Sequence, residues 1–233
     1  RCPPSAVAVP SLAAPTAGPG VLLAAAPLPP RLLFLSAPTT PTGTTVRRTA
    51  FGRFMGAVPE HVLVVLAEAY FEFVTDPEYP DGLKYFDGER PLVVLRTFSK
   101  IYSLAGLRIG YGFMPVPLAA AVDKLREPFN VNTVGQIAAA YSLDDQPEVL
   151  RRREENQEQK TYLYSCFDRP GVRYLESHTT FVYFMTEKPV EVFAAPLAHG
   201  VIARAFGNAP ALRPGSGRPS GTPSPPPPFP ADR

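Results

Sequence analysis

Two short apolar runs constrain the fold of this 233-residue chain more than any other feature. Val62–Leu66 is apolar at five consecutive positions, and Leu92–Leu95 repeats the pattern further along the chain. Strands that are apolar on both faces are typical of the centre of a parallel sheet with helices on both sides. Similar runs at Leu32–Leu35 and Ile109–Phe113 predict two further strands.

Segments with a helical pattern alternate with these strands. We expect helices over residues 47–57, Pro117–Arg126, Thr133–Leu143 and 147–167. Beyond them, the pattern predicts strands at Val172–Leu175, Phe181–Met185 and Val201–Ala203, and a helix at Val190–His199. Alternating strands and helices predict an α/β fold, in which a parallel-rich sheet is flanked by helices and followed by a small α+β C-terminal lobe.

Proline is concentrated at the two ends of the chain. Of the thirty prolines, ten lie within residues 1–41 and nine within residues 210–233. We therefore expect a disordered Ala/Pro-rich segment at residues 1–30 and a disordered Pro-rich tail at residues 214–233. Between them we expect a partial large domain over residues 31–150 and a partial small domain over residues 151–213.

Composition and charge exclude several classes of protein. A net charge of +2 with 45% hydrophobic residues excludes a wholly disordered chain and does not indicate a nucleic-acid partner. The tight basic run Arg151–Arg153 is followed at once by acidic residues, which predicts a solvated helix face. Prolines interrupt the longest apolar stretch, Val21–Leu35, so we expect no membrane span.

Cysteine and histidine usage gives two further expectations. The two cysteines and three histidines lack the spacing of metal ligands, so we expect no metal site. Such sparse cysteine usage fits a reducing, cytoplasmic compartment.

Polar and charged side chains follow the predicted strand Leu92–Leu95. Thr97, Ser99 and Lys100 come directly after it, and Arg108 lies eight residues beyond Lys100. Ligands of open α/β sheets bind beyond the carboxyl ends of the strands. Two hydroxyls and a guanidinium suit a phosphate, and a lysine amine suits a Schiff base with an aldehyde. The alternative is that Lys100 is an ordinary surface lysine at a strand end.

Two other strand ends carry candidate site residues. Tyr70 follows Val62–Leu66, and would reach the same sheet edge if the strands run parallel. The alternative is that Tyr70 is a core aromatic. The turn Thr39–Gly43, which includes Thr40, follows Leu32–Leu35.

Several of these segments resemble one enzyme family. Residues 96–112 read RTFSKIYSLAGLRIGYG and resemble the lysine segment of histidinol-phosphate aminotransferases, class I/II enzymes of fold type I that depend on pyridoxal 5′-phosphate. Residues 59–74 and 126–143 read PEHVLVVLAEAYFEFV and REPFNVNTVGQIAAAYSL, and resemble the flanking segments. Thr40–Thr44 is similar to the family's Asn-Pro-Thr-Gly turn, and the resemblance extends from about residue 31 to Arg213.

The resemblance implies a role for each candidate residue. Lys100 would form the Schiff base with pyridoxal phosphate and move the substrate proton. The cofactor phosphate would be held by Thr97, Ser99 and Arg108, and the cofactor ring oxygen by Tyr70 and, more weakly than by the usual asparagine, by Thr40. Arg204 and Arg213 would bind the substrate.

The reaction implied by the resemblance is a transamination in histidine biosynthesis. An amino group would pass between histidinol phosphate and 2-oxoglutarate, both small-molecule partners, in a homodimer. The family's N-terminal portion, with its glycine-rich phosphate loop, and its C-terminal helix have no counterpart in this chain, so we expect an incomplete enzyme.

Two positions depart from the family pattern. Ala67 replaces the aspartate that pairs with the pyridine nitrogen of the cofactor, and the adjacent Glu68 should point to the opposite face of the strand. Ser103 stands where the family usually has glycine. Two alternatives therefore stay open: a truncated or degenerate relative without activity, and another fold-type I enzyme, such as an amino-acid-phosphate decarboxylase.

Overall fold

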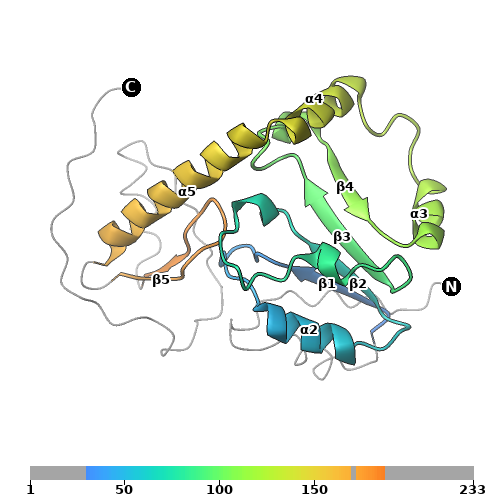
Figure 1. Cartoon of the computed structure of the whole chain (residues 1–233), viewed down its shortest axis with the longest axis horizontal. Coiled ribbons are helices and arrows are strands. Elements are labelled where there is room, and N and C mark those ends of the chain that lie inside the picture. The colour runs from blue at the N-terminus through green and yellow to red at the C-terminus, as the bar shows by residue number, and fades with distance from the viewer. Residues whose placement is uncertain (1–29, 169–171, 187–233) are drawn as a thin grey trace.

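A four-stranded sheet organises the first half of the chain, in a computed structural model that describes residues 30–168 and 172–186. The strand order is β1-β2-β3-β4 (Figure 1). Strands β1 (Leu32–Ser36), β2 (Leu63–Ala67) and β3 (Leu92–Thr97) are parallel, and β4 (Gly110–Phe113) runs antiparallel to β3. The predicted parallel-rich sheet is confirmed.

Pairing partners explain where the strands end. β2 begins one residue later than predicted and runs on to Ala67, because Ala67 pairs with both Ser36 and Leu95. β3 runs two residues past the predicted end, because Thr97 pairs with Gly110 of the antiparallel strand β4. The apolar pattern alone does not carry this information.

Helix α2 (Arg48–Ala57) covers one face of the sheet, as Figure 1 shows. Its buried side chains are Phe51, Phe54 and Met55. They pack against alternate residues of the strands, which point to the same face. These are Leu33, Val64, Leu66, Leu92 and Val94.

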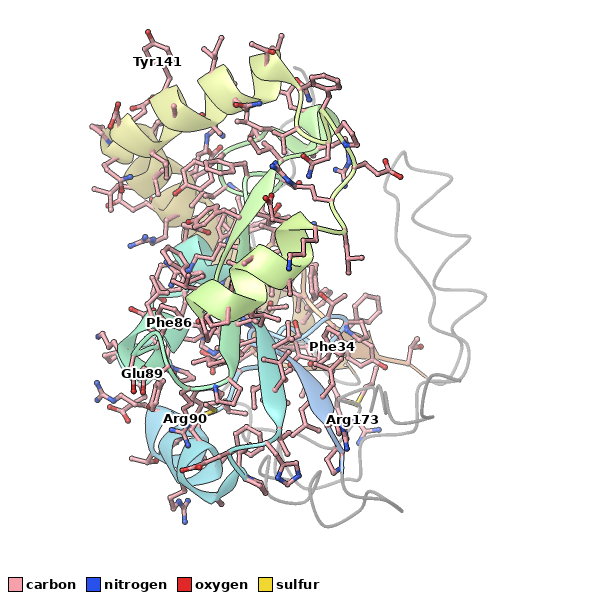
Figure 2. All side chains as sticks on the ribbon, turned by 90° about the vertical axis from the view of Figure 1, so that its right-hand side faces the viewer. Phe34, Phe86, Glu89, Arg90, Tyr141 and Arg173 are labelled. Atoms are coloured by element: carbon pink, nitrogen blue, oxygen red, sulfur yellow. The ribbon has the colours of Figure 1, made fainter. Side chains whose placement is uncertain are left out.

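The opposite face of the sheet is less covered. Phe34 of β1 is 49% exposed and Leu95 of β3 is 37% exposed. Phe34 alternates with the buried Leu33, and Figure 2 shows its side chain on the side of the sheet away from α2. This face consequently presents large apolar side chains to solvent.

Three helices follow the sheet. They are α3 (Val116–Asp123), α4 (Thr133–Asp144) and the long α5 (Gln146–Phe167). Asn132 caps α4 by accepting from the Gly135 amide, and Asp145 caps α5 by accepting from the Glu148 amide. α3 ends three residues before the predicted end, ahead of Pro128.

A small antiparallel hairpin completes the described part of the chain. It consists of β5 (Arg173–Tyr174) and β6 (Phe184–Met185), both shorter than predicted. α5 runs from the end of α4 to this hairpin, across the strand ends (Figure 1). The predicted helix Val190–His199 and strand Val201–Ala203 lie outside the described residues. The division into four segments at residues 1–30, 31–150, 151–213 and 214–233 stays a prediction.

Short 3-10 helices complete the connections. They are η1 (Phe71–Phe73), η2 (Gly82–Tyr85) and η3 (Ala105–Leu107). Among the described helices, none is long and apolar enough to cross a membrane. Within residues 30–168 and 172–186, no group of three or more His, Cys, Asp or Glu side chains is placed to hold a metal ion.

Candidate active site

Three loops that carry the candidate residues leave the same edge of the sheet. β1, β2 and β3 are parallel and in register, and they end at Ser36, Ala67 and Thr97. The turn with Thr40, the loop with Tyr70 and the loop with Lys100 therefore begin side by side. This arrangement confirms the predicted common edge, where α/β proteins bind their ligands.

Lys100 and Tyr70 come together at this edge. The Lys100 Nζ lies 5.1 Å from the centroid of the Tyr70 ring, within the range of a cation–π interaction. The Lys100 side chain is exposed, whereas Tyr70 is 7% exposed. The Tyr70 ring is held edge-on by Phe181 at 5.6 Å and packs beside Phe73. Tyr70 is thus a buried ring that faces an accessible amine.

The remaining candidates of the lysine loop lie on a short connection between β3 and β4. The Thr97 hydroxyl accepts a 3.0 Å hydrogen bond from the Ser99 amide. The Phe98 amide donates to the Ile109 carbonyl, which extends the β3–β4 ladder and places Arg108 beside this end of the loop. The Arg108 backbone is left-handed, with φ 56°, and its exposed guanidinium donates to the Ala105 carbonyl at 2.6 Å.

Thr40 lies in a tightly closed turn after β1. The Thr39 amide donates to the Thr44 carbonyl at 2.8 Å, and the Gly43 amide donates to the Thr39 carbonyl at 2.7 Å. Thr40 itself is exposed. The turn also meets the segment before β6, because the His178 amide donates to the Gly43 carbonyl at 2.8 Å.

A buried ion pair lies behind the site. Glu68 is fully buried and accepts from the Gly82 amide at 2.8 Å and from the Tyr79 hydroxyl at 3.0 Å. The Arg96 Nε donates to Glu68 at 3.0 Å, and Arg96 also pairs with Asp81 at 2.9 Å. Burial raises the pKa of the Glu68 carboxyl, and the Gly82 amide and Arg96 oppose that rise.

The ion pair between Glu68 and Arg96 determines on which face of the sheet the Glu68 carboxylate lies. Glu68 points to the face opposite Ala67, as predicted, and its oxygens are engaged by Tyr79, Gly82 and Arg96. It therefore cannot supply a carboxylate on the Ala67 side. The pair itself was not predicted, although alternation along β2 and β3 places Glu68 and Arg96 on the buried face with Leu66 and Val94.

The prediction that Arg151–Arg153 form a solvated helix face is correct for one of the three arginines. Arg151 is solvated, as predicted. Arg152 and Arg153 instead donate to carbonyls of the loops that carry Lys100 and Tyr70, so the prediction of a solvated face is wrong for these two residues. The predicted substrate arginines Arg204 and Arg213 lie outside the described residues.

The sequence of the chain matches the model of one protein family. The model of the family described as aminotransferase class I and II matches residues 21–223. The chain belongs to the aminotransferase class I and II family. The resemblance seen in the sequence is thereby confirmed.

Curated histidinol-phosphate aminotransferases are similar to the chain in sequence. The chain is 48% identical over 176 residues to histidinol-phosphate aminotransferase 2 of Carboxydothermus hydrogenoformans, covering 75% of this chain and 49% of the relative. It is 44% identical over 176 residues to histidinol-phosphate aminotransferase of Moorella thermoacetica, covering 75% and 46%. The chain therefore spans about half the length of the curated relatives it matches.

Solved aminotransferase structures show the same fold. Histidinol-phosphate aminotransferase from Sinorhizobium meliloti, in complex with pyridoxal 5′-phosphate, has a TM-score of 0.71 and 30% identity, covering 78% of this chain and 51% of that one. The Clostridium acetobutylicum enzyme has a TM-score of 0.71 at 21% identity, covering 78% and 56%, which shows the fold alone. The predicted partial fold-type I architecture is confirmed.

Proposed function

We propose that this chain carries the lysine half of a pyridoxal-phosphate-dependent aminotransferase that acts on histidinol phosphate and a 2-oxo acid. One observation carries the proposal: the exposed amine of Lys100 lies over the buried ring of Tyr70 at the carboxyl edge of the sheet. The family match and the histidinol-phosphate aminotransferases at 40–48% identity support this substrate class.

The residues present fit two parts of the cofactor. An accessible lysine amine fits its aldehyde, and the hydroxyls of Thr97 and Ser99 together with the Arg108 guanidinium fit its phosphate. For the third part, the pyridine nitrogen, Ala67 presents only a methyl group where the family has an aspartate, and Glu68 is engaged on the other face. When bound, the cofactor supplies an electron sink for charge that develops on the substrate.

The roles of the individual side chains follow from this fit. Lys100 would hold the aldehyde and move a proton at its Nζ, and Tyr70 would orient that amine with its ring and hold the ring oxygen of the cofactor. Thr97, Ser99 and Arg108 would anchor the phosphate, and Thr40 would contact the ring oxygen. Arg204 and Arg213 bind the acidic group of the substrate. A second copy of the chain as partner and a cytoplasmic location belong to the same proposal.

A covalent trap tests the proposal directly. Pyridoxal phosphate is added to the folded chain, borohydride reduces the adduct, and mass spectrometry locates the modified lysine. We expect modification at Lys100, none in Lys100→Arg, and unchanged modification in the matched control Lys124→Arg, which removes another exposed lysine. Equal labelling of Lys100 and Lys124 would contradict the proposal.

Ala67 favours a second candidate function, that of a non-catalytic relative which binds the cofactor without turnover. Ala67→Asp separates the two, since it restores a carboxylate at that position. Under the first proposal, the variant raises transaminase activity roughly tenfold to hundredfold, as one charge-assisted contact does. Activity that stays at zero in both chains while Lys100 is trapped supports the second. An assay for released carbon dioxide in the same samples tests the decarboxylase alternative.

A further inference from the structure

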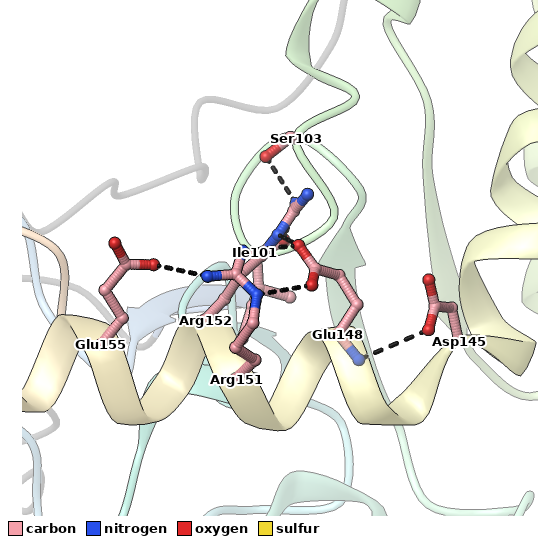
Figure 3. A network of polar contacts seen from close by, with 7 residues as sticks. All are labelled: Ile101, Ser103, Asp145, Glu148, Arg151, Arg152 and Glu155. Carbon is pink, nitrogen blue, oxygen red and sulfur yellow. Dashed lines mark hydrogen bonds and ion pairs between the residues drawn. The ribbon is translucent and has the colours of Figure 1, made fainter.

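Three consecutive arginines on α5 lie in three different environments, two of which, those of Arg151 and Arg152, are drawn in Figure 3. The Arg151 side chain is 59% exposed, and within the described part of the chain it pairs only with side chains of its own helix, Glu148 at 2.7 Å and Glu155 at 3.0 Å. The side chains of Arg152 and Arg153 extend from the helix to two different loops. Because Arg151 is the same residue type on the same helix but contacts neither loop, it is a matched control for Arg152 and Arg153.

Arg152 holds the loop that carries Lys100. Its Nη1 donates to the Ile101 carbonyl and to the Ser103 hydroxyl, both at 2.6 Å (Figure 3). Its Nε donates to Glu148 at 2.6 Å, which fixes the guanidinium from behind. Ile101 follows Lys100 directly in the chain and is buried, so the contact fixes the backbone next to the reactive amine.

The lysine loop is a compact turn. The Ser103 amide donates to the Lys100 carbonyl at 2.9 Å, and the Leu104 amide donates to the Phe98 carbonyl at 3.0 Å. Ser103 adopts a left-handed backbone with φ 57°, which is costly for a residue other than glycine. The serine hydroxyl that Arg152 grips therefore lies at a strained position, where a glycine would offer no side chain.

Arg153 holds the loop that carries Tyr70. Its Nε donates to the Glu72 carbonyl at 2.5 Å, within η1. The Phe73 amide in turn donates to the Tyr70 carbonyl at 3.0 Å, so the gripped segment includes the tyrosine backbone. Arg153 thus fixes the backbone of the Tyr70 loop, just as Arg152 fixes the backbone of the Lys100 loop.

We propose that Arg152 and Arg153 are positioning residues that set the separation between the Lys100 amine and the Tyr70 ring. Adjacent helix positions lie about 1.5 Å apart along a stiff axis, so two loops tied to them keep a fixed relative position. A reactive group on a loop needs such support to stay within about 0.5 Å of its working geometry. The purpose of the spacing rests on the proposed function, whereas the spacing itself can be measured without cofactor.

Methyl-lysine NMR measures this spacing. Reductive methylation with ¹³C-formaldehyde labels the accessible members of the five lysines, and Lys100→Arg identifies the Lys100 signal. In the unmodified sequence, we expect the Tyr70 ring current to shift the Lys100 methyl resonance away from the chemical shift of the exposed Lys124. We call this difference in chemical shift the Lys100 displacement, and Tyr70→Leu should remove it. Arg152→Met and Arg153→Met should each remove most of it, and Arg151→Met should leave it unchanged.

Lys160 reports whether each variant is folded. It is 4% exposed and its Nζ donates to the Ser177 carbonyl at 2.6 Å, so it resists methylation in the folded chain. An unchanged Lys100 displacement in a folded Arg152→Met or Arg153→Met chain overturns the proposal, as does an equal loss in Arg151→Met. If Arg152→Met exposes Lys160, the milder Ser103→Ala, which removes one acceptor, takes its place: a partial loss supports the proposal and no loss overturns it.

The borohydride trap separates this inference from the proposed function. A chain that shows the Lys100 displacement and its dependence on Arg152 and Arg153, yet is not trapped with pyridoxal phosphate, contradicts the proposed function and supports the positioning role. A chain that is trapped at Lys100 with the same yield and the same displacement in all three arginine variants supports the function and contradicts the positioning role.

Discussion

Glu68 and Arg96 form the most deeply buried ion pair among the described residues. Glu68 is fully buried, and the Arg96 guanidinium also lies 3.4 Å from the centroid of the Phe71 ring. A buried pair contributes little net stability compared with apolar residues, but removing one member leaves the other charge unpaired. The pair therefore matters most when it is broken.

Arg96→Met is expected to lower the free energy of unfolding by about 3–5 kcal/mol, because it strands Glu68 in the core. The matched control is Arg48→Met. Arg48 pairs with Glu78 at 2.8 Å, but both side chains are more than 40% exposed, so the expected loss is about 0–1 kcal/mol. Urea unfolding monitored by circular dichroism measures both, and equal losses would refute the assignment.

His178 gives the chain a pH dependence of defined sign. Burial lowers the pKa of the His178 imidazole, with Lys160 adding to the decrease and Asp76 and Glu176 opposing it. A histidine with a lowered pKa in the folded state stabilises the fold above its unfolded pKa of about 6.5, and that contribution is lost as the pH falls. Acidification should therefore loosen the contact between residues 175–181 and the turn at Gly43.

His178→Gln is expected to flatten this dependence. Between about pH 7.5 and about pH 5, the unmodified sequence should lose more unfolding free energy than the variant. The comparison is needed because burial raises the pKa values of Glu68 and Glu72, which act in the opposite direction in both chains. Parallel stability curves measured by urea titration across this range would show that His178 is not the responsible group.

Helices and strands differ in how far the sequence specifies them. The long helix α5 was predicted to within one residue at its start, since its pattern and its Asp145 cap are local. The bounds of β2 and β3 were displaced because they depend on partners distant in sequence, such as Gly110 opposite Thr97. The common edge for Lys100 and Tyr70 was predictable from parallel pairing, whereas the grip of Arg152 on Ile101 depends on how α5 crosses the sheet.

The contact between the β1 turn and the segment before β6 depends on one glycine. Gly43 has a φ of +75°, and a Cβ placed on it would lie 2.2 Å from the Ser177 Oγ. Any larger residue there must pay backbone strain and also push Ser177 away from the turn. The turn after β1 and the segment before β6 can therefore approach this closely because Gly43 has no side chain.

Gly43→Ala is expected to destabilise the chain more than Gly88→Ala does. Gly88 has a similar φ of +86°, but nothing lies within 4 Å of its would-be Cβ, so its substitution adds strain alone, about 1 kcal/mol. The difference between the two variants in thermal or urea unfolding isolates the contact with Ser177. Equal losses would show that the two elements adapt without cost.

The molecule presents apolar side chains at several places on its described surface. They include Phe34 on the edge strand β1, Leu95 on the same sheet face, and Tyr141, which Figure 2 shows pointing outward from α4. Edge strands with large apolar side chains promote association between chains. We therefore expect the exposed apolar face around Phe34 to contribute to association between chains.

Phe34→Ala is expected to reduce self-association and to change the free energy of unfolding by less than about 1 kcal/mol. Phe51→Ala is the control, because Phe51 is 1% exposed in the core and its truncation should cost about 3–5 kcal/mol. Sedimentation velocity over a concentration series measures the association, and urea unfolding measures the stability. Association that persists unchanged in Phe34→Ala would locate the responsible surface elsewhere.

Four polar contacts of α5 share one property that bears on how this architecture tolerates substitutions. Arg152, Arg153, Asn156 and Lys160 all donate to main-chain carbonyls, which belong to Ile101, Glu72, Thr179 and Ser177. A carbonyl is present whatever the side chain, so these four contacts depend on the path of the segments, whereas the contact of Arg152 with the Ser103 hydroxyl also depends on a side chain. At positions other than Ser103, these segments can therefore change side chains without losing these contacts, as long as their course past α5 is kept.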